Sequence, residues 1–150
     1  MGTEAPTSNS PIPIEQLSKI ATEACDSALA DVQGYEHSKV NQWSSEIINK
    51  ILQSLISATS ASPSEKSESS PASPTTQYRF NVTCTIIQQS PPNQDGTNGS
   101  IESSGRRGMH TASGAYWDVT RDGMWTFKYP GAEEKGMDLV LSVVWFGTSR

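Results

Sequence analysis

The chain has 150 residues and a net charge of −5, with 18% of its residues charged and 34% hydrophobic. This length suits one domain and is short for two. The acidic balance, without a basic stripe, argues against nucleic-acid binding, and no apolar run is long enough to predict a membrane span. The N-terminal residues lack the basic and apolar regions of a signal peptide, which predicts a cytoplasmic location.

Three stretches lack the apolar residues that a core needs. Residues 1–12 predict a disordered tail, and the Ser-, Pro- and Gly-rich stretches 57–76 and 90–108 predict flexible insertions. The rest of 13–150 is then expected to form a single domain. The Ser-Pro pairs in 57–76 either accept proline-directed phosphorylation or belong to a passive spacer.

Two amphipathic helices are predicted in the first half of the chain. Apolar residues recur at helical spacing over 14–32, with Pro13 in the first turn and Gly34 at the end. A wider apolar stripe over 40–56 predicts a second helix, for which Ser38 is the candidate N-cap.

The second half predicts antiparallel strands. Apolar and polar residues alternate over 78–86, a strand is expected over 124–129 after a turn at 121–123, and 130–136 is expected to be a loop. The last strand, 138–147, is apolar on both faces, so we expect both to be buried. The helices can cover only one face, and a second copy of the domain is expected on the other. The element order predicts an α+β domain of two layers.

The run Met109–Asp118, MHTASGAYWD, predicts another strand. It contains no proline and ends in aromatic residues. Fully extended it would span about 33 Å, which is longer than a usual strand. We therefore expect it to overhang its own sheet and to pair with another chain.

Catalysis is not predicted. His110, Ser113 and Asp118 are the residue types of a hydrolytic triad, but on one strand Ser113 points away from the other two. The outer pair would also lie about 26 Å apart, far beyond hydrogen-bonding reach.

No metal or cofactor site is predicted either. The two histidines, His37 and His110, do not stand at the spacings of zinc ligands. The two cysteines, Cys25 and Cys84, lie within apolar patterns and are expected to be reduced core residues.

Four segments resemble the Tctex-type dynein light chains. They occur in the family's order and extend over nearly all of the predicted globular part. They are HSKVNQW at 37–43, YRFNVTCTIIQ at 78–88, HTAS at 110–113 with Trp117 and Asp118 after it, and SVVWFG at 142–147.

The resemblance implies a homodimer in which two helices pack on each four-stranded antiparallel sheet and the second strand is exchanged. It further implies a non-catalytic light chain of the cytoplasmic dynein motor on microtubules. Its partners would be the dynein intermediate chain and cargo proteins, bound by strand addition in two equivalent grooves. A dimeric peptide-binding adaptor independent of dynein is the alternative.

The implied edge for dimer and peptide consists of His110, Thr111, Ala112, Ser113, Gly114, Ala115, Tyr116, Trp117 and Asp118. Its small central residues let a peptide approach closely. Its two aromatic residues either line the groove or belong to the dimer core. Asn41 and Gln42, on the polar side of the second helix, either support the groove or face solvent.

The chain departs from the family in its insertions 57–76 and 90–108, which are longer than the expected connections. Long polar loops cost little, because loop entropy grows only logarithmically with length. The second insertion directly precedes the exchanged strand, so a monomer without exchange stays an alternative.

Overall fold

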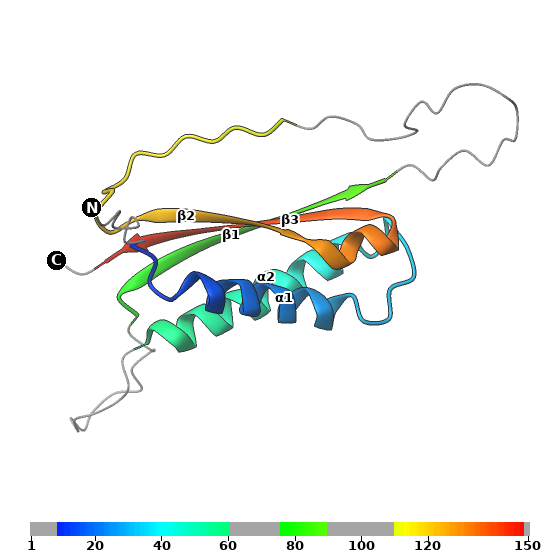
Figure 1. The fold of residues 1–150 in the computed structure, drawn as a ribbon, viewed down its shortest axis with the longest axis horizontal. Helices are drawn as coiled ribbons and strands as arrows, with labels where there is room; N and C mark the ends of the chain where they lie inside the picture. The colour runs from blue at the N-terminus through cyan, green and yellow to red at the C-terminus, as the bar shows by residue number, and fades with distance from the viewer. Residues whose placement is uncertain (1–8, 61–75, 90–109, 149–150) are drawn as a thin grey trace, which may run out of the picture.

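The computed structural model describes residues 9–60, 76–89 and 110–148. Two helices pack on one face of an antiparallel sheet, and a separate extended segment runs along the other face (Figure 1). The sheet has three strands in the order β1-β3-β2. The elements are α1 (Ile14–Ala28), α2 (Val40–Thr59), β1 (Tyr78–Gln88), β2 (Gly123–Tyr129), the 3-10 helix η1 (Pro130–Lys135) and β3 (Met137–Gly147).

Both helices form where the apolar spacing predicts them, but their ends differ. α1 ends at Ala28, so Gly34 lies in the connection between the helices and not at the helix end. Ser38 lies in the turn before α2 and is not its N-cap; Lys39 takes that position without a side-chain bond. α2 continues to Thr59, into the predicted insertion, because Leu55 and its neighbours still pack on the core.

β3 lies at the centre of the sheet and carries the core. It pairs with β1 along its whole length and with β2 from Leu139 to Trp145. Its alternate residues Leu139, Leu141, Val143 and Trp145 face the helices and are at most 3% exposed. The helices contribute eight further members of the core: Leu17, Ala21, Ala24, Cys25, Trp43, Ile47, Ile51 and Leu55. The remaining members are Ile12, Leu29, Tyr129, Ala132 and Met137.

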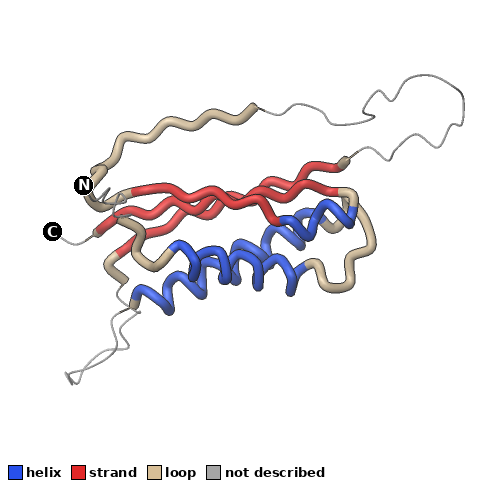
Figure 2. The backbone as a smooth tube through the Cα atoms, viewed as in Figure 1, coloured by secondary structure: helices blue, strands red, loops and turns tan. Residues whose placement is uncertain are grey.

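The prediction of a four-stranded sheet is wrong for the described part of one chain. Residues 110–118 are extended but pair with no strand, so Figure 2 draws them as a loop. The expected loop 130–136 is also more ordered than predicted. It forms η1, with Pro130 in its first turn and Gly136 at φ 70° after its end, a conformation that glycine adopts without strain.

The packed body begins before the predicted boundary at residue 13, since Ile12 is only 7% exposed. Ser60 and Thr76 form an isolated antiparallel bridge at the base of the first insertion. The Ser-Pro pairs of that insertion, Met109 and the whole of 90–108 lie outside the described residues. Among the helices described, none is long and apolar enough to cross a membrane.

Two leucines of α2 test how the core stabilises the fold. Leu55 is fully buried and Leu52 is half-buried. Leu55→Ala is expected to lower the free energy of unfolding by about 3–4 kcal/mol, because it removes buried methyl groups and leaves a cavity. Leu52→Ala, the control in the same helix, is expected to cost about half as much. Urea unfolding followed by circular dichroism measures both, and equal losses would contradict the assigned core.

Candidate functional site

Residues 110–118, here called the arm, run along the face of the sheet opposite the helices (Figure 1). From His110 to Trp117 the backbone makes no hydrogen bond to another described residue. Tyr116 is fully exposed, at 104% relative accessibility, and Trp117 is half-buried. The arm is therefore an extended segment that pairs with no strand among the described residues.

The arm and the sheet enclose a groove of about 470 Å³. The sheet side is the face away from the helices, here called the open face, and its apolar centre is Val140, Val144 and Phe146. The opposite wall is formed by the arm residues Thr111, Ser113, Gly114, Ala115 and Trp117. The open face is thus the second apolar face that the sequence of β3 predicts, and among the described segments of one chain the arm lies over it.

The outer edge of β2 is unpaired in the described part of the chain. At the ends of the β1–β3 ladder, Gln89 N donates to Gly136 O and Thr148 N donates to Gln77 O, so the even-numbered residues of β3 bond to β1. The odd-numbered ones then bond to β2. It follows that the backbone N–H and C=O groups of Met124, Thr126 and Lys128 point away from the sheet.

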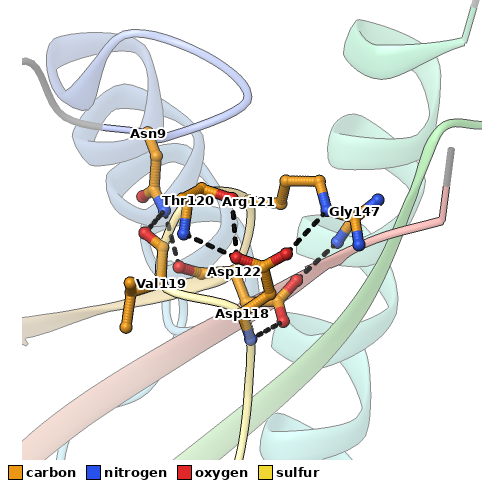
Figure 3. A network of polar contacts seen from close by, with 7 residues as sticks. All are labelled: Asn9, Asp118, Val119, Thr120, Arg121, Asp122 and Gly147. Carbon is orange, nitrogen blue, oxygen red and sulfur yellow. Dashed lines mark hydrogen bonds and ion pairs between the residues drawn. The ribbon is translucent and has the colours of Figure 1, made fainter. Parts of the chain in front are cut away.

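A network of polar contacts holds the turn between the arm and β2, residues 118–122, here called the hinge (Figure 3). Asp122 N donates to Asp118 O at 2.8 Å. The two carboxylate oxygens of Asp122 accept hydrogen bonds from Asp118 N and from Gly147 N, each at 2.8 Å. The Asn9 side-chain amide donates to Val119 O at 3.1 Å and to Asp122 O at 2.6 Å.

The side chain of Asp118 adds to this network. Hydrogen bonds from the hydroxyl and the backbone N–H of Thr120 lower the pKa of the Asp118 carboxyl, with a smaller contribution from Arg121. The carboxylate form is thereby favoured at the hinge. The ion pair between Asp118 and Arg121 is exposed to solvent, so it contributes little to stability.

The structure places the predicted edge residues, from His110 to Asp118, on one continuous segment. Asn41 and Gln42 are exposed on α2, which packs on the other face of the sheet, and Gln42 bonds to Glu46. Within one chain they are not brought to the arm, and their predicted support of the groove stays a prediction.

Sequence reasoning missed two residues of this region. The run from Asp118 to Asp122 has acidic side chains flanking a threonine, a composition typical of turns closed by side-chain hydrogen bonds. Asp122 was therefore within reach of sequence reasoning. Asn9 was not, because its contacts join residues more than 100 positions apart.

The described residues contain no group of three or more His, Cys, Asp and Glu side chains that could hold a metal ion. His110, Ser113 and Asp118 are spread along the extended arm, and Asp118 is engaged in the hinge. The arrangement offers backbone pairing groups and a groove in which apolar side chains alternate with Ser, Thr and Asn. It is suited to binding an extended chain.

Comparison with known proteins decides the family. The model of the Tctex-1 family matches residues 11–146. The chain belongs to the Tctex-1 family. The match includes the arm, the hinge, β1, β2 and β3 as far as Phe146, and it begins after Asn9.

Relatives in the family are similar over most of their length. Human dynein light chain Tctex-type 3 is 26% identical over 129 residues, which are 86% of this chain and 81% of the relative. The dynein light chain Tctex-type of Schizosaccharomyces pombe is 27% identical over 135 residues, covering 90% and 95%. That of Drosophila melanogaster is 28% identical over 130 residues, covering 87% and 86%.

The reactivity of the two cysteine thiols tests their assigned burial. Both are free; burial raises the pKa of the Cys25 thiol to about 12 and raises that of Cys84 as well. Since the thiolate is the reactive form, the native protein is expected to react slowly with a disulfide reagent at pH 8, and Cys25 more slowly than Cys84. Single Cys→Ser variants, measured native and in urea, separate the two thiols. Rapid modification of native Cys25 would contradict its assigned place in the core.

Proposed function

We propose that the protein is a light chain of the dynein motor, a strand-exchanged homodimer that binds the dynein intermediate chain and cargo proteins by strand addition. One observation carries the proposal: within the described residues the arm is extended and pairs with no strand, and the outer edge of β2 beside its hinge is unpaired. The names of its relatives, which are dynein light chains, support the motor role. Catalysis has no part in it.

Backbone energetics support the exchange. Fixing a residue in one backbone conformation costs about 1–2 kcal/mol, and the arm makes no ladder bonds that offset this cost. The unpaired groups of Met124, Thr126 and Lys128 provide those bonds. If the arm of each chain pairs with β2 of the other, both sheets gain the fourth strand that the resemblance implies.

The hinge predicts the register of that pairing. Asp118 lies opposite Asp122, so an antiparallel continuation places Tyr116, Gly114 and Ala112 opposite Met124, Thr126 and Lys128 of the other copy. The intervening residues of the arm, Thr111, Ser113, Ala115 and Trp117, would then point their backbone groups outward. This new outer edge is where we place the bound peptide.

The position of the arm supports the same dimer. It lies over the open face, across a groove, as a strand of a second sheet packed on the first would lie. Two copies would therefore cover each other's Val140, Val144 and Phe146. The two peptide edges of the dimer would bind two segments of the intermediate chain, which raises their effective concentration.

Prolines at neighbouring positions of the arm test the register. Gly114→Pro removes an N–H directed at β2 of the partner, and we expect it to raise the dissociation constant of the dimer at least about tenfold. Ser113→Pro removes an N–H directed at the peptide, so the dimer should persist and peptide binding should weaken. Gly114→Ala is the size control, because a Cβ there meets nothing within 4 Å.

Sedimentation equilibrium measures the dimer in this series, and calorimetry measures the peptide. If Gly114→Pro left both the dimer and peptide binding unchanged, the pairing would be refuted. A wild-type monomer at tens of micromolar would refute the bivalent dimer itself.

Binding of the intermediate chain is tested directly by titrating the dimer with a peptide from the intermediate chain that contains the segment by which that chain binds light chains. We expect one peptide per copy, and a lower affinity for the Ser113→Pro variant. The matched control is the same peptide in scrambled order. Absence of binding by a normal dimer would exclude the motor role and favour the adaptor that is independent of dynein.

A further inference from the structure

We propose that the side chains of Asn9 and Asp122 act as a stop that prevents the arm from closing as a hairpin on β2 of its own chain. The stop would reserve the arm for a second copy. This inference rests on the proposed strand exchange and adds the device that favours it over a closed monomer.

The hinge resembles the start of a β-hairpin in which Asp118 and Asp122 form only one of the two backbone hydrogen bonds expected between them. In an antiparallel pair, two opposite residues exchange both N–H···O bonds. Asp122 N donates to Asp118 O at 2.8 Å, as such a hairpin requires. The reciprocal bond, from Asp118 N to Asp122 O, is not formed.

Both groups of the missing bond are occupied by side chains (Figure 3). Asp118 N donates instead to the Asp122 carboxylate, at 2.8 Å. Asp122 O accepts instead from the Asn9 amide, at 2.6 Å. The single hydrogen of Asp118 N is therefore engaged, and closing the hairpin would first require breaking its bond to the Asp122 carboxylate. Asp122 O already accepts from the Asn9 amide, so Asp118 N would have to displace that amide or share the carbonyl with it.

Neither side chain is held by the hinge alone. The second carboxylate oxygen of Asp122 accepts from Gly147 N at the end of β3, which fixes the carboxylate on the sheet. Both bonds of the Asn9 amide go to hinge residues, the second to Val119 O, so its support outside the hinge comes from the chain that follows it. Ile12, three residues later, is buried in the core and anchors this stretch of chain.

Gly123 provides the space in which Asn9 lies. A Cβ on Gly123 would stand 2.9 Å from Asn9 Oδ1 and 2.5 Å from the Trp145 ring. A larger residue at the first position of β2 would displace one of them. The absence of a side chain at this position therefore admits the stop.

The test compares Asn9→Ala with Asn49→Ala, a control that removes an exposed asparagine of α2 far from the hinge. A pair of added cysteines, Gly114→Cys and Thr126→Cys, reports the arm's partner in each background, because these positions are opposite in both states. Oxidation gives a disulfide between chains in the exchanged dimer and within one chain in the closed monomer. Non-reducing electrophoresis separates the two products, and the variants without added cysteines are analysed by sedimentation.

We expect the wild type and Asn49→Ala to give the disulfide between chains. Asn9→Ala should shift product to the disulfide within one chain and raise the dimer dissociation constant about tenfold, since a dimer contains two such hinges. A disulfide between chains in the wild type would support the exchange. If Asn9→Ala then left the ratio of the two disulfide products and the dimer dissociation constant unchanged, or strengthened the dimer, the stop would be refuted while the exchange stands. If the wild type itself links within one chain, the proposed exchange fails, and the stop with it.

Discussion

Hydrogen bonding on both sides of β3 is the constraint on which the rest of the structure depends. Because β3 pairs with β1 and with β2, its alternate residues are fixed in orientation, and Leu139, Leu141 and Val143 must face the helices. The same alternation places Val140 and Val144 on the open face. A strand that is apolar on both sides thus needs two covers, and the helices provide one.

The second constraint concerns the edges of the sheet. The three described strands leave two outer edges, and an edge with unpaired backbone groups can pair with any extended chain. On the β2 side, alternate residues of β2 bond to β3, so the backbone N–H and C=O groups left available are those of Met124, Thr126 and Lys128. The arm is joined directly to this strand by the hinge. Its own chain is therefore the nearest competitor of any partner for the same edge.

Patterns of local origin were predictable from the sequence. The stripe of α2 and the two apolar faces of β3 arise from repeats of a few residues, which the side chains themselves determine. The helix ends and η1 were missed, because turns and short helices depend on single hydrogen bonds. The arm was predicted as a strand, but whether an extended run is paired depends on a partner strand. The contact of Asn9 with the hinge is set by the complete fold and leaves no local pattern.

The closed monomer and the exchanged dimer would contain the same backbone hydrogen bonds between the arm and β2. The segments that connect the arm to the rest of the chain therefore determine which of the two forms is favoured. On one side lies the insertion 90–108, whose length adds little to the cost of either form, because loop entropy grows logarithmically. On the other side lies the hinge, only five residues long over 118–122, with side-chain bonds at both backbone groups of the missing rung. A long connection lets the arm reach β2 of its own chain and β2 of a second copy equally well. A short connection such as the hinge restricts the direction in which the arm leaves β2. Selection between the chain's own edge and that of a second copy is therefore expected to reside in the hinge and in Asn9.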